Sequence, residues 1–313
     1  TIAGQTAPGD GITLRGHGLN VYADDVVIRY LRVRPGDAEG VETDAISVSK
    51  GSNIILDHCS TSWATDETLS ISPSSKNVKR PIDNVTVQWS IISESLNDSV
   101  HSKGEHGYGS LVRGNDGARY SMHHNLWAHH QARMPRPGNY LDHESDPTGP
   151  VIDFRNNVFY NWGGGHSGYN ADTDSVSRYN FVGNYYIEGA DSQAAVAFKE
   201  SSPYASMYFA DNWMNGEPVA DPLSVVRLPE GRSLADSEFS HETRATEPAD
   251  VAFRAVLENA GASLVRDSVD KRVVEAVSNG SGRIIDSVAD VGGWPEHESL
   301  PSPPGTDEGG MPD

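Results

Sequence analysis

The sequence predicts an all-β protein, a stacked coil of parallel strands followed by a helical and extended C-terminal segment. Three observations support this prediction. Short strand-like segments recur at intervals of 27 to 35 residues, asparagine recurs at equivalent positions of these segments, and the pattern changes from strand-like to helical after about residue 222. A period of this length is typical of solenoid folds, in which each repeat stacks on the next.

The repeated segments are bounded by turns and rich in aromatic and β-branched residues, as strands are. They begin near residues 30, 53, 83, 118, 151, 177 and 207. Steps of 31, 35, 32, 27 and 28 residues separate the aligned positions Cys59, Ser90, Asn125, Asn157, Asn184 and Asn212. Asparagine suits a stacked corner because its amide both donates and accepts hydrogen bonds and because it tolerates left-handed backbone. The alignment therefore favours a stacked coil over a sandwich.

The amino-acid composition excludes or disfavours several kinds of binding and metal site. The chain has 313 residues, is 36% hydrophobic and carries a net charge of −20, which disfavours binding to nucleic acid or to an anionic membrane. Cys59 is the only cysteine, so an internal disulfide and a cysteine-based zinc site are excluded. No apolar run is long enough to span a membrane. The chain opens at Thr1 in strand-like sequence, and we expect an export signal and a first coil to precede it.

Two amphipathic helices are predicted after residue 222. The segments ADVAFRAVLENAGASL and RDSVDKRVVEAVSNG place apolar residues at spacings of three and four, and Glu247 and Pro248 form a helix start. We expect residues 1–221 to form the parallel β-helix and residues 222–298 to form a helical and irregular segment that packs on it. Residues 299–313, rich in proline, glycine and acid, are expected to be an extended or disordered tail.

A basic, histidine-rich window lies between His101 and Arg136. It contains six of the twelve histidines: His101, His106, His123, His124, His129 and His130. Its five basic side chains, Lys103, Arg113, Arg119, Arg133 and Arg136, oppose only Glu105 and Asp116, a net charge of +3 in an acidic chain. No HExxH or facial-triad spacing is present, which disfavours zinc or iron. The window is the candidate working surface, with His106 as a possible general base in a glycine-rich loop.

Acidic residues provide the second functional signal. Glu42 and Asp44 are two residues apart and would share one face of a strand, while Asp66 lies about one coil later, followed by Glu67. Several carboxylates without a thiol favour a hard cation, and Ca²⁺ fits best. A solvated strand edge is the alternative interpretation of these acids.

The chain resembles a known family through several motifs taken together. They are TIAGQTAPGDGI at the start, DAISV at 44–48, DHCSTSW at 57–63, HHN at 123–125 and ARMPRPG at 132–138. The resemblance, which runs from the first residues to about residue 215, is to the pectate lyases of polysaccharide lyase family 1. It implies a right-handed parallel β-helix that cleaves polygalacturonate by calcium-assisted β-elimination. It also implies a monomer that is secreted, either extracellular or periplasmic.

The resemblance assigns roles to individual residues. It implies that Arg133 is the catalytic base, that Glu42, Asp44 and Asp66 bind calcium, and that Lys103 and Arg136 bind substrate carboxylates, with His106 as a further substrate contact. Two positions depart from the family pattern. Ser70 stands where another calcium-binding aspartate is expected, so that Glu67 or substrate oxygens would fill the place. Arg136 follows Arg133 by three residues instead of five.

Arginine is an unusual base, because a free guanidinium loses its proton only above about pH 12. Neighbouring calcium and Lys103 would lower the pKa of Arg133, which predicts an alkaline activity optimum. Three alternatives remain open from the sequence. They are a β-helix glycoside hydrolase that uses an acid pair such as Asp57 and Asp66, a calcium-independent pectin lyase, and a non-catalytic β-helix that binds acidic polysaccharide.

Overall fold

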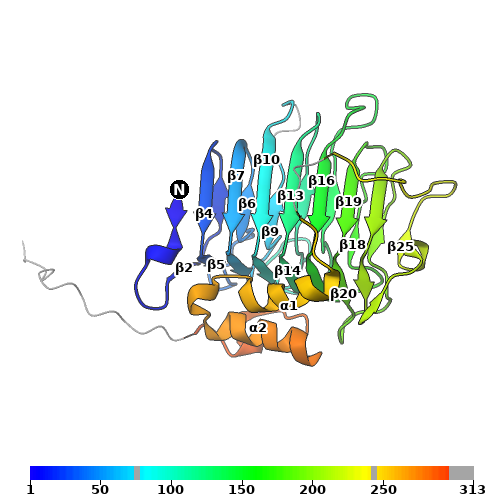
Figure 1. The fold of residues 1–313 in the computed structure, drawn as a ribbon. Helices are drawn as coiled ribbons and strands as arrows, with labels where there is room; N and C mark the ends of the chain where they lie inside the picture. The colour runs from blue at the N-terminus through cyan, green and yellow to red at the C-terminus, as the bar shows by residue number, and fades with distance from the viewer. Residues whose placement is uncertain (74–77, 241–244, 296–313) are drawn as a thin grey trace, which may run out of the picture.

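The computed structural model describes residues 1–73, 78–240 and 245–295. The predicted tail at residues 299–313 lies outside the described residues. The chain winds into successive coils of three short strands, and equivalent strands of successive coils pair in parallel to form long sheets along the axis (Figure 1). The predicted parallel β-helix is confirmed.

The strands fall into three rows. The first row is an eight-stranded sheet of β1 (Ile2–Ala3), β4 (Val26–Arg29), β7 (Gly51–Asp57), β10 (Ile82–Gln88), β13 (Arg119–His123), β16 (Val151–Arg155), β19 (Arg178–Val182) and β22 (Ser206–Ala210). The second is a nine-stranded sheet of β2 (Ile12–Arg15), β5 (Leu31–Arg34), β8 (Ser60–Ser62), β11 (Ile91–Ser93), β14 (Leu126–His130), β17 (Val158–Trp162), β20 (Tyr185–Ile187), β23 (Trp213–Met214) and β24 (Glu217–Pro218). The third row consists of β3 (Leu19–Val21), β6 (Ile46–Val48), β9 (Leu69–Ile71), β12 (Leu111–Arg113) and β15 (Arg136–Gly138), and of a separate three-stranded sheet, β18 (Gly168–Tyr169), β21 (Phe198–Lys199) and β25 (Val226–Arg227).

A buried asparagine ladder runs along the corner between the first two rows. The Asn125 amide donates to Asn157 Oδ1 at 3.1 Å, Asn157 donates to Asn184 at 3.1 Å, and Asn184 donates to Asn212 at 3.0 Å. Ser90 and Cys59 continue the row toward the N-terminus through backbone N–H groups, which donate to the next side chain. The six positions aligned in the sequence therefore form one continuous ladder.

The corner beside the ladder requires left-handed backbone at the preceding residue of each coil. His58, Trp89, His124 and Asn156 have φ between 50° and 56°, a region that non-glycine residues seldom occupy. Hydrogen bonds from the neighbouring asparagine amides to backbone carbonyls, such as Asn125 to Val87 at 2.9 Å, satisfy the groups that this turn leaves unpaired. The interior is filled by stacked apolar side chains, among them Phe154 on Phe181 with ring centroids 4.9 Å apart.

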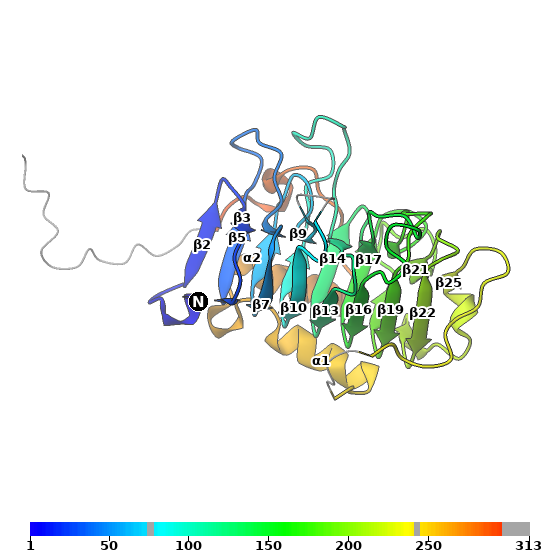
Figure 2. The same cartoon turned by 90° about the horizontal axis from the view of Figure 1, so that it is seen from above.

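Two helices form where the sequence predicted them, and they lie against the second row of strands. Helix α1 (Ala249–Asn259) follows Pro248, and helix α2 (Ser268–Asn279) is capped by Asp267. Short 3₁₀ helices lie at Gly4–Thr6, Pro222–Ser224, Ser263–Val265 and Val288–Val291. Val256 and Val273 pack against Ile91, Leu126 and Val158 of the solenoid. Long loops project from the side that α1 leaves uncovered (Figure 2). Within the described residues, no helix has the length and apolar character needed to cross a membrane.

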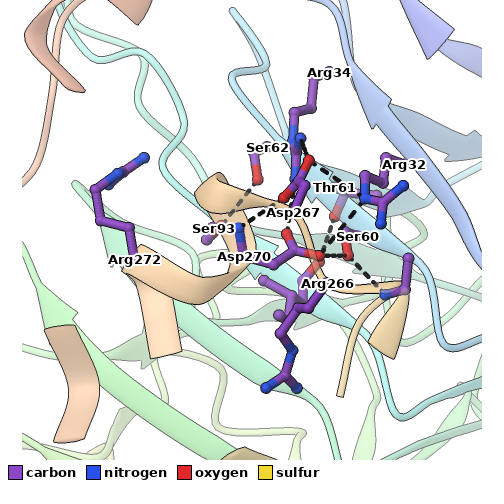
Figure 3. A network of polar contacts seen from close by, with 12 residues as sticks. Arg32, Arg34, Ser60, Thr61, Ser62, Ser93, Arg266, Asp267, Asp270 and Arg272 are labelled. Carbon is purple, nitrogen blue, oxygen red and sulfur yellow. Dashed lines mark hydrogen bonds and ion pairs between the residues drawn. The ribbon is translucent and has the colours of Figure 1, made fainter. Parts of the chain in front are cut away.

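Helix α2 is fixed to the solenoid by buried ion pairs (Figure 3). Arg34 Nη2 on β5 donates to Asp270 Oδ1 at 2.7 Å, and the Ser60 hydroxyl on β8 donates to the other oxygen of Asp270 at 2.6 Å. Arg34 also contacts Asp267, and Arg32 Nε lies 3.4 Å from the same carboxylate. Neither the Arg34 nor the Asp270 side chain is exposed. The charges are therefore compensated within the interface between helix and sheet.

Replacing Asp270 by alanine is expected to lower the free energy of unfolding by about 3–5 kcal/mol, because it leaves a buried guanidinium without a full set of counter-charges. Asp250→Ala is the matched control, since it removes the same charge from an exposed pair with Arg254 and should cost less than about 1 kcal/mol. Guanidinium chloride unfolding of the three proteins measures the difference. Equal losses in the two variants would contradict the proposed anchoring of α2.

Candidate active site

The candidate site lies at the segments that lead into the third row of strands. Asp44 precedes β6, Glu67 precedes β9, Tyr108 precedes β12 and Arg133 precedes β15. The backbone connects them across coils. The Ala45 N–H donates to the Glu67 carbonyl at 3.2 Å, and Tyr108 forms parallel bridges with Glu67 and Ala132. Residues far apart in sequence are therefore stacked in adjacent coils.

Three carboxylates form the centre of this site. Asp44, Asp66 and Glu67 each offer an oxygen, and the three oxygens lie within 4.8 Å of one another. Burial and the neighbouring Asp66 charge raise the pKa of Asp44 to about 7, against the hydroxyls of Ser70 and Ser47, which lower it. Two oxygens bound to one calcium ion at about 2.3–2.6 Å lie at most about 5 Å apart. The donor set and the spacing therefore fit a hard divalent cation.

Glu42 does not join this cluster. It lies in an irregular segment before β6 instead of on a strand, so the expectation that Glu42 and Asp44 share a strand face is wrong. Its exposed carboxylate accepts the Ser102 N–H at 2.7 Å, and that hydrogen bond lowers the pKa of Glu42. His101 Nε2 lies 3.6 Å from the second oxygen. Glu42 thus connects the loop before β6 to the loop before β12.

Two stacked histidines lie beside the Asp66 carboxylate. His106 Nε2 lies 3.1 Å from Asp66 Oδ1, and His101 Nε2 lies 3.8 Å from Asp66 Oδ2. The two rings stack with centroids 3.7 Å apart. The Nδ1 atom of His101 accepts the Lys103 N–H at 3.1 Å, so the neutral ring carries its proton on Nε2 and faces the carboxylates as a donor. These histidines orient Asp66.

Arg133 connects the carboxylates to a group of basic residues. Its backbone is left-handed, with φ of 63°, and its guanidinium lies over the Tyr108 ring, with Cζ 3.9 Å from the centroid, in contact with the Glu67 carboxylate. Burial lowers the pKa of Arg133, and Arg136 contributes in the same direction, against Tyr169 and Asp66. The structure therefore holds this arginine where its neutral form is more accessible than in water.

The predicted substrate-binding residues are separated. Arg136 lies at the start of β15, and its Nη2 is 3.2 Å from Asp172 Oδ1. Lys103 lies in the exposed turn after His101, where its charge lowers the pKa of Glu42 and of His106. The structure thus brings Asp44, Asp66, Glu67, His106 and Arg133 together, while Glu42, Lys103 and Arg136 lie around them.

Sequence reasoning did not single out three neighbours of the site, Tyr108, Tyr169 and Asp172, and it gave Arg113 no role beyond its charge. Arg113 precedes its strand partner Gly138 by 25 residues, and Tyr108 precedes Arg133, whose guanidinium lies over its ring, by the same number. This common spacing of 25 residues was the signal in the sequence that could have brought these residues together. It is shorter than the spacings of 27 to 35 residues along the asparagine ladder. It becomes visible only when the register of β12 and β15 is known.

Curated relatives match the whole chain. Proteins named pectate lyase C from Aspergillus flavus and Aspergillus oryzae are each 34% identical over 322 residues, which covers 100% of this chain and 70% of theirs. The Emericella nidulans protein of the same name is 35% identical over 325 residues and is covered to 69%. No protein-family model matches the chain.

Solved structures share the fold at low sequence identity. A pectate lyase studied for substrate specificity and an anti β-elimination mechanism has a TM-score of 0.55 at 14% identity, and the match covers 83% of this chain and 67% of that one. A pectate lyase bound to a hexasaccharide has a TM-score of 0.53 at 14% identity, covering 82% and 66%. Together with the curated relatives, they define a β-solenoid polysaccharide lyase. The chain belongs to the pectate lyase family.

The Asp44 carboxyl makes stability depend on pH in the absence of divalent cations. Its pKa of about 7 in the folded protein lies above its ordinary value of 3.8. Between these two pH values the folded state binds more protons than the unfolded state, so the protein loses stability as the pH rises through this window. Below about pH 4 the group is protonated in both states. Asp44→Asn should therefore stabilise the protein by about 4 kcal/mol above pH 7 and by little at pH 4.

Chemical denaturation in a chelator at several pH values measures this difference. Asp142→Asn is the control, because that carboxylate is exposed and its pKa is lowered by the backbone N–H of Ser145. A stability difference for Asp44→Asn that does not change with pH would contradict the raised pKa.

Proposed function

We propose that this chain cleaves α-1,4-linked polygalacturonate by calcium-dependent β-elimination, with Arg133 as the base. The observation that supports it most is the contact of a buried arginine with one member of a three-carboxylate cluster. The pectate lyase relatives support the reaction class. The substrate is supported by a similar fold, a Bacillus pectate lyase solved in complex with trigalacturonate, with a TM-score of 0.52 at 15% identity covering 80% of this chain and 72% of that one.

In this proposal Asp44, Asp66 and Glu67 hold the calcium ion, and Glu42 lies at its edge. Calcium bound there would stabilise the negative charge that develops on the uronate carboxyl group when C5 loses its proton. If Glu67 coordinates a cation, its negative charge no longer balances the Arg133 guanidinium that it contacts in the present structure. The same event that completes the cation site therefore favours the neutral base.

Arg133 takes the proton from C5 of the uronate. The C4–oxygen bond to the leaving sugar then breaks as a double bond forms between C4 and C5, and the released oxygen takes up a proton, so that no water is consumed. Arg136 and Lys103 neutralise other carboxylates of the polymer, and His106 keeps Asp66 in position. Concentrating cationic side chains at one site allows a chain of net charge −20 to bind an acidic polymer.

The structure disfavours the glycoside hydrolase alternative. Asp57 ends β7 and is engaged by Arg29 at 2.6 Å, by His58 and by Gln88, whereas Asp66 contacts His101 and His106. Burial alone would raise the pKa of Asp57, but the hydrogen bonds from His58, Gln88 and Arg29 outweigh it and lower the pKa to about 2. Such a carboxylate is a poor general acid.

The proposal includes the setting in which the enzyme acts. Polygalacturonate is a polymer that does not enter cells, so we infer that the chain acts as a secreted or periplasmic protein. It is expected to act as a monomer, as the family resemblance implies. Sedimentation analysis tests that expectation.

Activity on polygalacturonate tests the reaction. The unaltered protein should release products with the ultraviolet absorbance of an unsaturated uronate, should lose activity in a chelator and should regain it with excess calcium. Arg133→Ala should lower kcat by about 10³-fold, the usual contribution of a general base. Arg254→Ala, on the exposed face of α1, is the matched control and should leave kcat unchanged.

Each alternative gives a different outcome. Full activity in the chelator or in Arg133→Ala would contradict the proposed mechanism, and activity in the chelator with a preference for esterified substrate would indicate a pectin lyase. Reducing ends without ultraviolet absorbance would indicate a hydrolase, and binding without any product would indicate a non-catalytic protein.

The pH dependence of kcat/KM tests the base itself. Because a base acts in its deprotonated form, activity should rise toward alkaline pH. Arg133→Lys should shift the rising limb to lower pH, since the free lysine pKa of about 10.4 lies below that of arginine, about 12.5 or above. An unchanged profile in an active Arg133→Lys variant would argue that another group removes the proton.

A further inference from the structure

A pair of arginines beside the candidate site shares one carboxylate. Arg113, at the end of β12, donates from Nη2 to Asp172 Oδ1 at 2.6 Å, and Arg136, at the start of β15, reaches the same oxygen at 3.2 Å. Burial lowers the pKa of Arg113, and Arg136 lowers it further, against Asp172. One carboxylate thus faces two guanidinium groups.

Hydrogen bonds to neighbouring residues hold Asp172 in place. Its N–H donates to Asn170 Oδ1 at 2.9 Å, and the Asn170 amide donates to the buried carboxyl of Glu200 at 2.8 Å. A side chain at position 138 would leave no room, since a Cβ atom on Gly138 would lie 2.3 Å from Asp172 Oδ2. These contacts fix the Asp172 carboxylate between the two arginines. The group therefore differs from an exposed surface ion pair, in which both side chains can move.

The pair is close to the proposed base. Tyr169 lies near enough to Arg133 to raise its pKa against the effect of burial, and the Arg136 Cζ atom lies 5.8 Å from the centre of the Tyr169 ring. The charge of Arg136 acts on both Arg133 and Arg113. The side chains of Arg113 and Arg136 are 17% and 16% exposed, so a ligand has access to them.

We propose that Arg113 and Arg136, positioned by Asp172, form an anion-binding subsite for the carboxylate of a uronate unit next to the one cleaved at Arg133. The inference rests on the proposed function, because a polygalacturonate chain carries a carboxylate on every unit. A guanidinium pair binds a carboxylate through charge-assisted hydrogen bonds. Methyl esterification removes that charge, so this subsite selects an unesterified unit.

Binding of trigalacturonate tests the subsite without requiring turnover. All titrations use the whole chain with Arg133→Ala, in the presence of calcium. Four proteins are compared: this parent variant, and the parent combined with Arg113→Ala, with Arg113→Lys or with Arg254→Ala. Arg113→Ala should weaken binding about tenfold to a hundredfold, the range for losing charge-assisted hydrogen bonds. The affinity of the Arg113→Lys protein should lie between that of the parent and that of Arg113→Ala, because an ammonium keeps the charge but not the bidentate geometry. Arg254→Ala, which removes the same charge from α1, should not change binding.

A second measurement separates recognition from structural support. With Arg133 intact, Arg113→Ala should raise KM on unesterified polygalacturonate about tenfold and change KM on highly methyl-esterified pectin by less than about twofold. Thermal unfolding of each variant reports whether it is folded. The inference is overturned if folded Arg113→Ala binds trigalacturonate as tightly as the Arg254→Ala control, or if it loses the same factor on esterified and unesterified polymer.

The proposed function can fail separately. If the unaltered protein gives no unsaturated product but Arg113→Ala still weakens trigalacturonate binding, the reaction is wrong and the subsite stands as a uronate-binding site. If the unaltered protein is active and the Arg113 variants match the control, the subsite is wrong and the reaction stands.

Discussion

The register between successive coils is the constraint on which the rest of the structure depends. Parallel backbone pairing fixes the height of each strand relative to the next, and the Asn125, Asn157, Asn184 and Asn212 side chains link one corner of four successive coils. In the earlier coils, the pairing of β9 with β6 and β12, and of β12 with β15, stacks the segments that precede these strands. A change of one residue in register would move Glu67, Tyr108 and Arg133 onto opposite faces.

The candidate site depends on charges that are incompletely compensated. Burial and the neighbouring Asp66 charge raise the pKa of Asp44 to about 7 within a cluster of three carboxylates, while burial and mutual repulsion lower the pKa of Arg133 and of Arg113. Each group therefore favours an added ion of opposite charge, a cation at the carboxylates and a carboxylate at the arginines. A calcium ion and a polyuronate chain would supply both, which explains why acidic and basic groups lie side by side.

The fold was largely predictable because its signals are local and repeated. The six ladder positions and the two helices could be found in the sequence, and the structure bears them out. The expected boundary after residue 221 is not sharp, because β25 still pairs with β21 in the solenoid. The site was less predictable, because irregular loops of different length separate its residues. Glu42 was grouped with Asp44 on a strand that does not extend to either residue. Arg113 and Asp172 come together only because Gly138 leaves space between two coils. The roles of Arg133, Lys103 and Arg136 remain predictions.

The central claim is that Arg133 removes a proton from a uronate beside a carboxylate-bound cation, so that the glycosidic bond breaks by elimination. Mass spectrometry of the products formed from a defined oligogalacturonate tests it most directly. The account predicts that the fragment from the reducing end is lighter by one water molecule than the product of hydrolysis and carries a double bond at its new non-reducing end, and that Arg133→Ala forms almost none of it. A saturated fragment that has gained water would contradict the account.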